Sequence, residues 1–542
     1  MPVLALVSQG ALSGVLLPTF LILSIASFVL FGLVELVWPG HLPESVKEQV
    51  SIIINKYLDW KYPILHKDGR TKLPSCPYVW PNGQGDIAKF LDGLENSSSW
   101  EKQNGAVYRI WSGMKPEVVL TQPRMLQPVF KDSDKHSKAP ANNSGWYMGQ
   151  LLGQCVGLIS GQNWRALRAV TEVPFGHRAI SLRVGDFQQH VASHFADLHR
   201  KGTMGQGRIH PAGDMKMLPF WVVAEIFYGR SLSAELKDEL RHLAPVRERI
   251  FHEHVIQGGL PRFSMSQYLP TRANAELRAY KQAWKEFNQR AVAFACVSEP
   301  DAPIIQMQEA VASGDITEEQ LLQTLDESLY ANLDVTTGGL SWNLVFLAAH
   351  PEAQSRVRAE VLAASREGRL EGYLLDRTTY LSACVLESAR LRPLAAFSVP
   401  QAAPTDREID GYVIPAGTSF IVDAYALNIR NEAWAPDNEA FRPERFLASL
   451  GGRDHGDRDG DRGGIKTASE LRYLFWRFGF GPRQCMGKHA ADLIIRATLA
   501  YLVQNYELGL LSDDAWVRSR ECWISHPDFQ LRCVRRPDEV GS

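Results

Sequence analysis

The sequence predicts a mainly α-helical domain with small β-sheets, preceded by one N-terminal transmembrane helix. Three observations support this prediction. Apolar side chains recur at helical spacing over much of the 542 residues, whereas strand-like alternation is confined to short pieces. No charged side chain occurs from Met1 to Val34. Near the other end, a single cysteine stands in a Gly-rich loop directly before an apolar helical run.

The uncharged N-terminal run predicts a membrane anchor over residues 1–40. Residues 11–34 would extend about 36 Å as a helix, which is enough to cross a bilayer. The alternative is a buried core helix, but such helices seldom stay uncharged over this length. Lys47 is the first basic residue, so the positive-inside rule predicts that the rest of the chain is cytosolic.

The remainder of the chain is expected to be a connector and one large domain. Pro74, Pro77 and Pro81 indicate a stiff, proline-bearing connector over residues 41–82. The domain is expected over residues 83–537. Within it, residues 449–466 are Gly-rich and of mixed charge, so they predict an exposed loop insertion.

Helices and strands are expected at positions set by apolar periodicity. The expected helices are Asn163–Val170, Leu218–Tyr228, Glu235–Phe251, Ala275–Cys296, Thr317–Ala349, Pro351–Ser365, Tyr380–Leu391 and Lys488–Gln504. The expected strands are Glu408–Val413, Ser419–Ala424 and Phe529–Val534.

Charge and cysteine content narrow the function classes. The net charge is −2, so nothing indicates a nucleic-acid partner. The seven cysteines are scattered, without a C-x-x-C pair or zinc-like spacing. This distribution fits a reducing compartment with one functional thiolate.

The most informative segment is the loop F-G-F-G-P-R-Q-C-M-G at residues 478–487. A thiolate at Cys485 would lie near the N-terminus of the next helix, where backbone N–H groups favour negative charge. The glycines let the backbone approach a flat, bulky group. This layout suits a metal held through one sulfur with its opposite face open. The alternative is a buried structural cysteine.

The pattern F-x-x-G-x-R-x-C-x-G resembles the haem-binding signature of the cytochrome P-450 family. It is formed by Phe478, Gly481, Arg483, Cys485 and Gly487. The resemblance implies the cytochrome P-450 fold and haem b as the cofactor. It also implies that Cys485 is the axial ligand of the haem iron and that Arg483 reaches the propionates.

Three further motifs follow the order of that family. Trp164 and Arg168 match W-x-x-x-R, a pair that reaches a haem propionate in the family. Glu387 and Arg390 match E-x-x-R, and Arg445 lies in a P-E-R-F segment. The resemblance implies that Glu387, Arg390 and Arg445 form a buried structural ion triad beneath the haem loop.

The remaining motif departs from the family pattern A-G-x-D/E-T-T. Asp334 supplies the acid, and Trp342 keeps the register, but Val335 replaces the usual alcohol and Asn332 the usual glycine. In the family the acid and alcohol deliver protons during O₂ activation. The resemblance therefore assigns catalysis to Asp334 and to Thr336, although a helix turns about 100° per residue, so Thr336 points elsewhere than residue 335.

Three outcomes of this departure stay open. The substrate, a water or Asn332 could supply the missing hydroxyl, so that the enzyme hydroxylates its substrate. Radical coupling, ring closure or desaturation could instead replace oxygen insertion. The family could also tolerate Val335 with ordinary chemistry. A second departure is Gln401, near which many relatives carry a basic residue that binds a propionate.

The resemblance implies a monooxygenase that inserts one oxygen atom of O₂ into an apolar small molecule. Electrons would come from NADPH through NADPH–cytochrome P-450 reductase, with cytochrome b5 as a second candidate donor. The chain would sit in the endoplasmic reticulum membrane as a single-pass protein. Arg472, Arg477 and Lys488 are expected on the docking face.

The residues in and around these motifs are similar to those of filamentous-fungal enzymes of secondary metabolism, including enzymes that act on diketopiperazines in gliotoxin-type pathways. Toxins and alkaloids are products of the same kind of pathway. A steroid or fatty-acid hydroxylase is an alternative. A haem isomerase or dehydratase and a non-catalytic haem protein are rivals, but the intact haem loop and Asp334 disfavour them.

Overall fold

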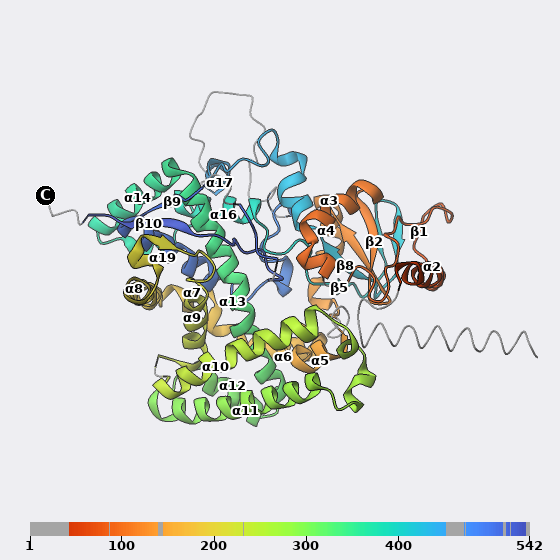
Figure 1. Cartoon of the computed structure of the whole chain (residues 1–542), viewed down its shortest axis with the longest axis horizontal. Helices are drawn as coiled ribbons and strands as arrows, with labels where there is room; N and C mark the ends of the chain where they lie inside the picture. Colours follow the sequence, from red (N-terminus) through yellow and green to blue (C-terminus); the bar gives the residue numbers. More distant parts are fainter. Residues whose placement is uncertain are drawn as a thin grey trace, which may run out of the picture.

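The computed structural model describes residues 43–85, 87–138, 145–230, 232–450, 471, 473–512, 516–520 and 522–537. This part of the chain is mainly helical, with three small sheets (Figure 1). The predicted anchor at residues 1–40 and residues 451–466 of the predicted loop lie outside the described residues. Among the helices that the structure describes, none is long and apolar enough to cross a membrane.

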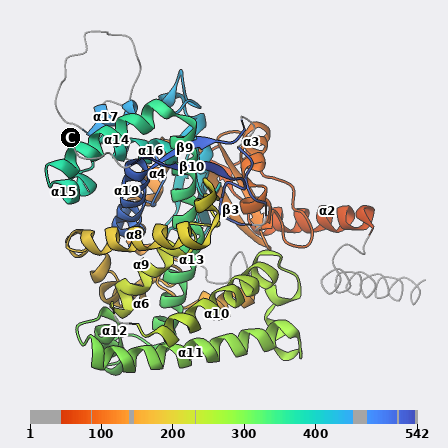
Figure 2. The same ribbon diagram turned by 60° about the vertical axis from the view of Figure 1, so that its left-hand side comes forward.

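Helix α13 (Glu318–Ala349) runs through the middle of the molecule (Figures 1 and 2). It begins at a capping box, in which Thr317 and Gln320 satisfy each other's backbone N–H groups. Its neighbours are α9 (Met217–Tyr228), α16 (Tyr380–Leu391) and α19 (Lys488–Asn505). These helices are buried along most of their length, so the main core surrounds α13.

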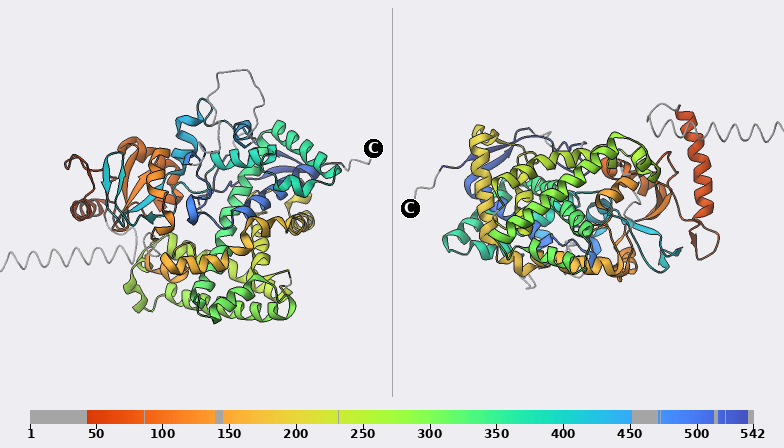
Figure 3. Two further views of the ribbon diagram at one scale, coloured as in Figure 1. Left: turned by 180° about the vertical axis from the view of Figure 1, so that it is seen from behind. Right: turned by 90° about the horizontal axis from the view of Figure 1, so that it is seen from below.

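Further helices cover this core. A layer crosses one end of the molecule (Figures 1 and 3). It is formed by α10 (Ala234–Ile250), α11 (Arg272–Ser298) and α12 (Pro303–Ala312). The other helices are α2 (Glu44–Lys61), α3 (Gly93–Asn104), α4 (Pro123–Phe130), α5 (Gly145–Leu152), α6 (Gly161–Thr171), α7 (His177–Ser181), α8 (Val184–Lys201), α14 (Pro351–Arg366), α15 (Leu370–Leu375) and α17 (Glu444–Leu450).

The three sheets join distant parts of the chain. The largest has the order β2 (Val107–Ser112), β3 (Lys115–Leu120), β8 (Ser419–Val422) and β5 (Gln401–Ala402), with β3 and β8 parallel. The second has the order β1 (Leu65–His66), β7 (Tyr412–Ile414) and β6 (Arg407–Ile409). The third has the order β4 (Arg208–Ile209), β10 (Leu531–Arg535) and β9 (Tyr506–Leu510).

The mainly α fold with small sheets confirms the predicted class, and helices occur at all eight predicted places, with ends shifted by a few residues. The single strand predicted at Glu408–Val413 is wrong. The chain turns there at Asp410–Gly411, both with positive φ, so the segment forms the β6–β7 hairpin. The segment predicted as a connector contains α2 and β1, and β1 pairs with β7.

Candidate active site

The loop before α19 is closed by a backbone hydrogen bond. The N–H of Cys485 donates to the carbonyl of Phe478 at 2.9 Å. Gly481 has a φ of +70°, and a Cβ there would lie 2.3 Å from Ser133 Oγ, so only glycine fits. Gly487 then serves as the N-cap residue of α19. These constraints hold the cysteine at the start of a helix.

The Cys485 side chain borders a space inside the protein. Its side chain is exposed, yet burial is the main cause that raises the pKa of its thiol, while the Gly487 N–H and Arg168 act to lower that pKa. A group that is deep in the protein and also exposed faces an internal space. A bound metal cation would reverse the pKa shift, because it takes the place of the proton.

Arg483 presents an unsatisfied cation in this region. One guanidinium nitrogen donates to the carbonyl of Ile159 at 2.7 Å, and the group stacks over Trp164 with 4.6 Å to the ring centroid. Its Nη1 is buried and has no hydrogen-bond partner among the described residues. Burial, and then the charge of Arg168, lower the pKa of Arg483 to about 10. An anion beside Arg483 would accept a hydrogen bond from its Nη1 and would compensate its buried positive charge.

A second cation here was missed by the sequence analysis. Burial, and then the charge of Arg483, lower the pKa of Lys138 to about 7. Ser137 pairs with Ala402 through two backbone bonds of 3.0 and 2.9 Å. This antiparallel bridge places Lys138 opposite Gln401, near which this chain lacks the basic residue that many relatives carry. No local sequence pattern reveals a contact between segments this far apart.

The residues present fit a haem group. A haem carries two propionates and binds a thiolate through its iron. Here a thiol lies within electrostatic range of shared neighbours of two cations, Arg483 and Lys138, and neither cation forms an ion pair with a carboxylate of the described residues. Arg168 differs from them, since it pairs with Glu172 at 2.5 Å and donates to the carbonyl of Gln484 at 3.0 Å.

The structure brings the three predicted triad residues together. Glu387 accepts bonds from Arg390 at 2.7 and 2.8 Å and from Arg445 at 2.9 Å. Glu387 and Arg390 are completely buried. Arg390 also donates to the carbonyl of Asn428, whose side chain makes bonds of 2.9 and 2.8 Å with the backbone of Trp476. The triad therefore connects to the residues that lead into the Cys485 loop.

Asp334 is held in place by the C-terminal segment. Trp523 Nε1 donates to its carboxylate at 3.1 Å, and His526 Nε2 donates to its backbone carbonyl at 2.7 Å. Gly338 makes room for this contact, because a Cβ there would lie 2.9 Å from the His526 ring. Trp342 Nε1 donates to a carbonyl of the same segment at 2.8 Å.

The threonines after Asp334 turn into the protein. Thr336 and Thr337 are buried, whereas Asp334 and Val335 are half-buried. Thr337 Oγ1 has no hydrogen-bond partner among the described residues. Thr336 lies about 200° around the helix from Asp334, so the structure does not place the predicted catalytic pair on one face. The side chain of Asn332 lies outside the described residues.

Comparison with known proteins decides the family. The family model described as Cytochrome P-450 matches residues 87–525. The chain is 55% identical to cytochrome P-450 monooxygenase aclC of Aspergillus oryzae, over 89% of this chain and 96% of that protein. It is 39% identical to cytochrome P-450 monooxygenase gliC of Aspergillus fumigatus, over 91% and 94%.

The chain belongs to the cytochrome P-450 family. A solved zebrafish cytochrome P-450 with progesterone shares the fold, with a TM-score of 0.62, 18% identity, and coverage of 81% of this chain and 98% of that one. Family membership implies a haem cofactor, a redox partner and a small-molecule substrate.

The cytochrome P-450 has a basic hollow beside its haem loop. The hollow has a volume of about 720 Å³, and residues 478–482 of the loop line one wall. Its basic lining residues are Lys131, Arg377, Arg477, Lys488 and Arg496, and its acidic one is Asp492. Arg477 pairs with Asp492 at 2.6 Å, and Lys488 donates to Gln484. Arg472, also predicted on the docking face, lies outside the described residues.

Proposed function

We propose that this protein is a membrane-bound, haem-dependent monooxygenase of fungal secondary metabolism. It inserts one oxygen atom of O₂ into an apolar small molecule with electrons derived from NADPH. The observation that supports this best is the exposed thiol of Cys485 before α19, with two cations, Arg483 and Lys138, that share charged neighbours with it. The similarity to aclC and gliC, both named monooxygenases, supports the reaction class.

Each residue of the site has a distinct task in this proposal. When bound, haem supplies the activation of O₂, which thiolate ligation favours. Cys485 holds the iron, and Arg483 and Lys138 neutralise the propionates with Trp164 stacked on Arg483. The triad of Glu387, Arg390 and Arg445 fixes the segment before the loop. Arg168 positions the loop through the carbonyl of Gln484.

Asp334 holds and passes the protons that O₂ reduction consumes. Trp523 fixes the carboxylate, and its ring meets Phe90 and Phe251 edge to face or tilted, each at 5.9 Å. The acid therefore stands next to an aromatic wall built from three separate segments. Such a wall suits an apolar substrate.

Oxidative coupling, ring closure or desaturation is the second candidate outcome. It is favoured by Val335, which is half-buried on α13 without a hydroxyl, while both following threonines are buried. Without an alcohol beside the acid, α13 offers no hydroxyl there to position a proton-delivering water. With haem bound, the site would then remove two hydrogens from the substrate and form a bond within it, while O₂ and the electrons from NADPH would end as water. The resemblance to diketopiperazine enzymes makes cyclic dipeptides the first substrates to test.

Turnover under ¹⁸O₂ tests the function. The full chain is supplied with NADPH, a microsomal reductase and a fungal metabolite extract, and products are identified by mass spectrometry. The Cys485→Ser variant is the control. A labelled product that the control lacks supports oxygen insertion. An unlabelled, dehydrogenated or coupled product supports the second candidate, and no product from either protein contradicts both.

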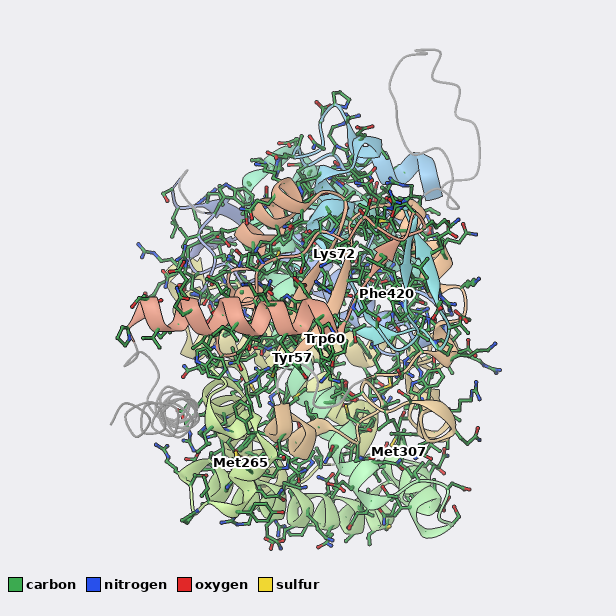
Figure 4. The ribbon with its side chains drawn as sticks, turned by 90° about the vertical axis from the view of Figure 1, so that its right-hand side faces the viewer. Tyr57, Trp60, Lys72, Met265, Met307 and Phe420 are labelled. Atoms are coloured by element: carbon green, nitrogen blue, oxygen red, sulfur yellow. The ribbon has the colours of Figure 1, made fainter. Side chains whose placement is uncertain are left out.

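The proposed location is the endoplasmic reticulum membrane, with the domain in the cytosol. Exposed apolar side chains of α2, including Trp60 at 76% exposure, and of residues 265–269, including Tyr268 at 82%, support membrane contact. Figure 4 looks onto the face that carries Tyr57, Trp60 and Met265. Alkaline extraction of fungal membranes tests this proposal. The full chain should stay in the membrane pellet, and release into the supernatant contradicts a spanning anchor.

A further inference from the structure

We propose that Glu327 binds the substrate by accepting a hydrogen bond from a nitrogen that bears hydrogen. The donor is a lactam or amide N–H or a protonated amine. This inference rests on the function proposed above and names the chemical group of the substrate that Glu327 recognises.

Glu327 and Asp334 share one face of α13. They are two helical turns apart, seven residues, which corresponds to about 10.5 Å of rise and about 20° of rotation. Asp334 lies beside the aromatic wall described above, and its carboxylate already accepts a bond from Trp523. Glu327 is thus a second carboxyl group that points to the same side of the helix.

Glu327 faces the space that the haem-site residues border. Burial is the main cause that raises its pKa, yet its side chain is half-exposed, as are those of Lys138 and Arg483. Its charge raises the pKa of Cys485, of Arg483 and of Lys138. These charge interactions, together with the shared face of α13, put Glu327 in the neighbourhood of the haem-site residues.

The carboxyl has unused acceptor capacity. Its Oε2 accepts the N–H of Gly157 at 3.1 Å, and it contacts the thiol of Cys155. Among the described residues, no Lys, Arg or His forms an ion pair with it. A carboxylate offers about four acceptor sites, and a buried one is costly unless those sites are filled. A donor from the substrate would fill them.

The local structure does not need Glu327 to hold the loop at residues 154–157. Gln323 and Thr324 of α13 already accept the N–H groups of Gln154 and Val156, at 2.7 and 3.1 Å. A Cβ at residue 157 would lie 1.9 Å from Glu327 Oε1. Glycine at residue 157 therefore leaves room for the Glu327 carboxyl, although Gln323 and Thr324 already attach the loop to α13.

The test measures binding to the haem-loaded full chain by calorimetry. The probes are cyclo-(L-Phe-L-Ala), its N,N′-dimethyl derivative, and the matching piperazine, whose nitrogens are basic. The wild-type protein should bind one of the two N–H probes about tenfold or more tightly than the dimethyl probe. Glu327→Leu should reduce that ratio to near one.

Two further variants separate the possible donors and a purely structural role. Glu327→Gln keeps most of the selectivity if the donor is a neutral lactam, and loses it if the donor is the protonated piperazine. Thr324→Val removes a comparable loop contact and should leave the selectivity unchanged. If Glu327→Leu and Thr324→Val weaken all probes equally, Glu327 acts only on the loop and the inference is overturned.

The carbon monoxide difference spectrum distinguishes failure of the Glu327 assignment from failure of the proposed function. A thiolate-type spectrum together with a wild-type selectivity ratio near one overturns the Glu327 assignment and leaves the proposed function intact. A protein without that spectrum contradicts the haem-thiolate function and the Glu327 assignment together.

Discussion

Residue 335 decides whether the acid on α13 has an alcohol beside it. Val335→Thr adds a hydroxyl next to Asp334 on the half-buried side of the helix. We expect lower hydrogen peroxide release per NADPH consumed and a larger hydroxylated share of the product, because a hydroxyl can position a proton-delivering water. Val335→Ala alters the shape without adding a hydroxyl and serves as the control. Unchanged leakage and product would show that Val335 has no effect on the chemistry.

Lys138 should make haem retention depend on pH. Burial holds its pKa down from 10.5 to about 7, and a propionate would raise that pKa again. Haem binding then takes up a proton above about pH 7, so haem affinity falls as pH rises, whereas below that pH the lysine is charged in both states. Lys138→Met should lose haem to apomyoglobin faster near neutral pH and show a flatter pH profile.

The matched control for this prediction is Lys135→Met, which alters an exposed lysine of the same segment. It should retain haem like the wild-type protein. Equal pH profiles for wild type and Lys138→Met would contradict a contact between Lys138 and a propionate.

At the scale of elements, the Glu387 triad fastens α16 to the segment before the haem loop. Glu387→Ala leaves Arg390, which is completely buried, and Arg445 without their anion. We expect a loss of about 3–5 kcal/mol in the free energy of unfolding, measured by denaturant titration of the haem-loaded protein. Glu507→Ala breaks the exposed pair with Arg532 and should cost less than about 1 kcal/mol. Similar losses for the two variants would contradict this account.

The elements also show what the sequence could predict. Long helices such as α13 and α19 follow from apolar periodicity and capping residues, and the Cys485 loop follows from fixed local spacing. The β6–β7 hairpin was missed, because its Asp410–Gly411 turn sits inside what reads as one strand. Lys138 and His526 were missed for a different reason. Each acquires its place only through a contact with a distant segment.

At the scale of the whole molecule, the site depends on segments that lie far apart in the sequence. Arg390 of α16 bonds Asn428, which holds Trp476 before the haem loop, and the loop leads into α19 at Gly487. The acid of α13 is held by Trp523 and His526. The proposed places of substrate chemistry and of electron entry therefore have different surroundings. The aromatic wall and Asp334 lie along α13, and the basic hollow lies beside the loop that carries Cys485.

The basic hollow predicts how the molecule meets its electron donor. Lys131 and Arg377 are exposed at its rim, and among the described residues that line it, Asp492 is the one acidic side chain. Reversing both charges, with Lys131→Glu and Arg377→Glu, should raise the KM for an acidic flavoprotein reductase several-fold, because rim charges mainly govern association. The effect should shrink at high salt. The kcat at saturating reductase and the binding of cyclic dipeptides should stay unchanged, since neither residue borders the internal space.

Arg278→Glu, an exposed charge reversal on α11, is the control and should leave the KM unchanged. If Arg278→Glu raises the KM as much as the double variant does, the effect is a general one of charge, and docking at the hollow is contradicted.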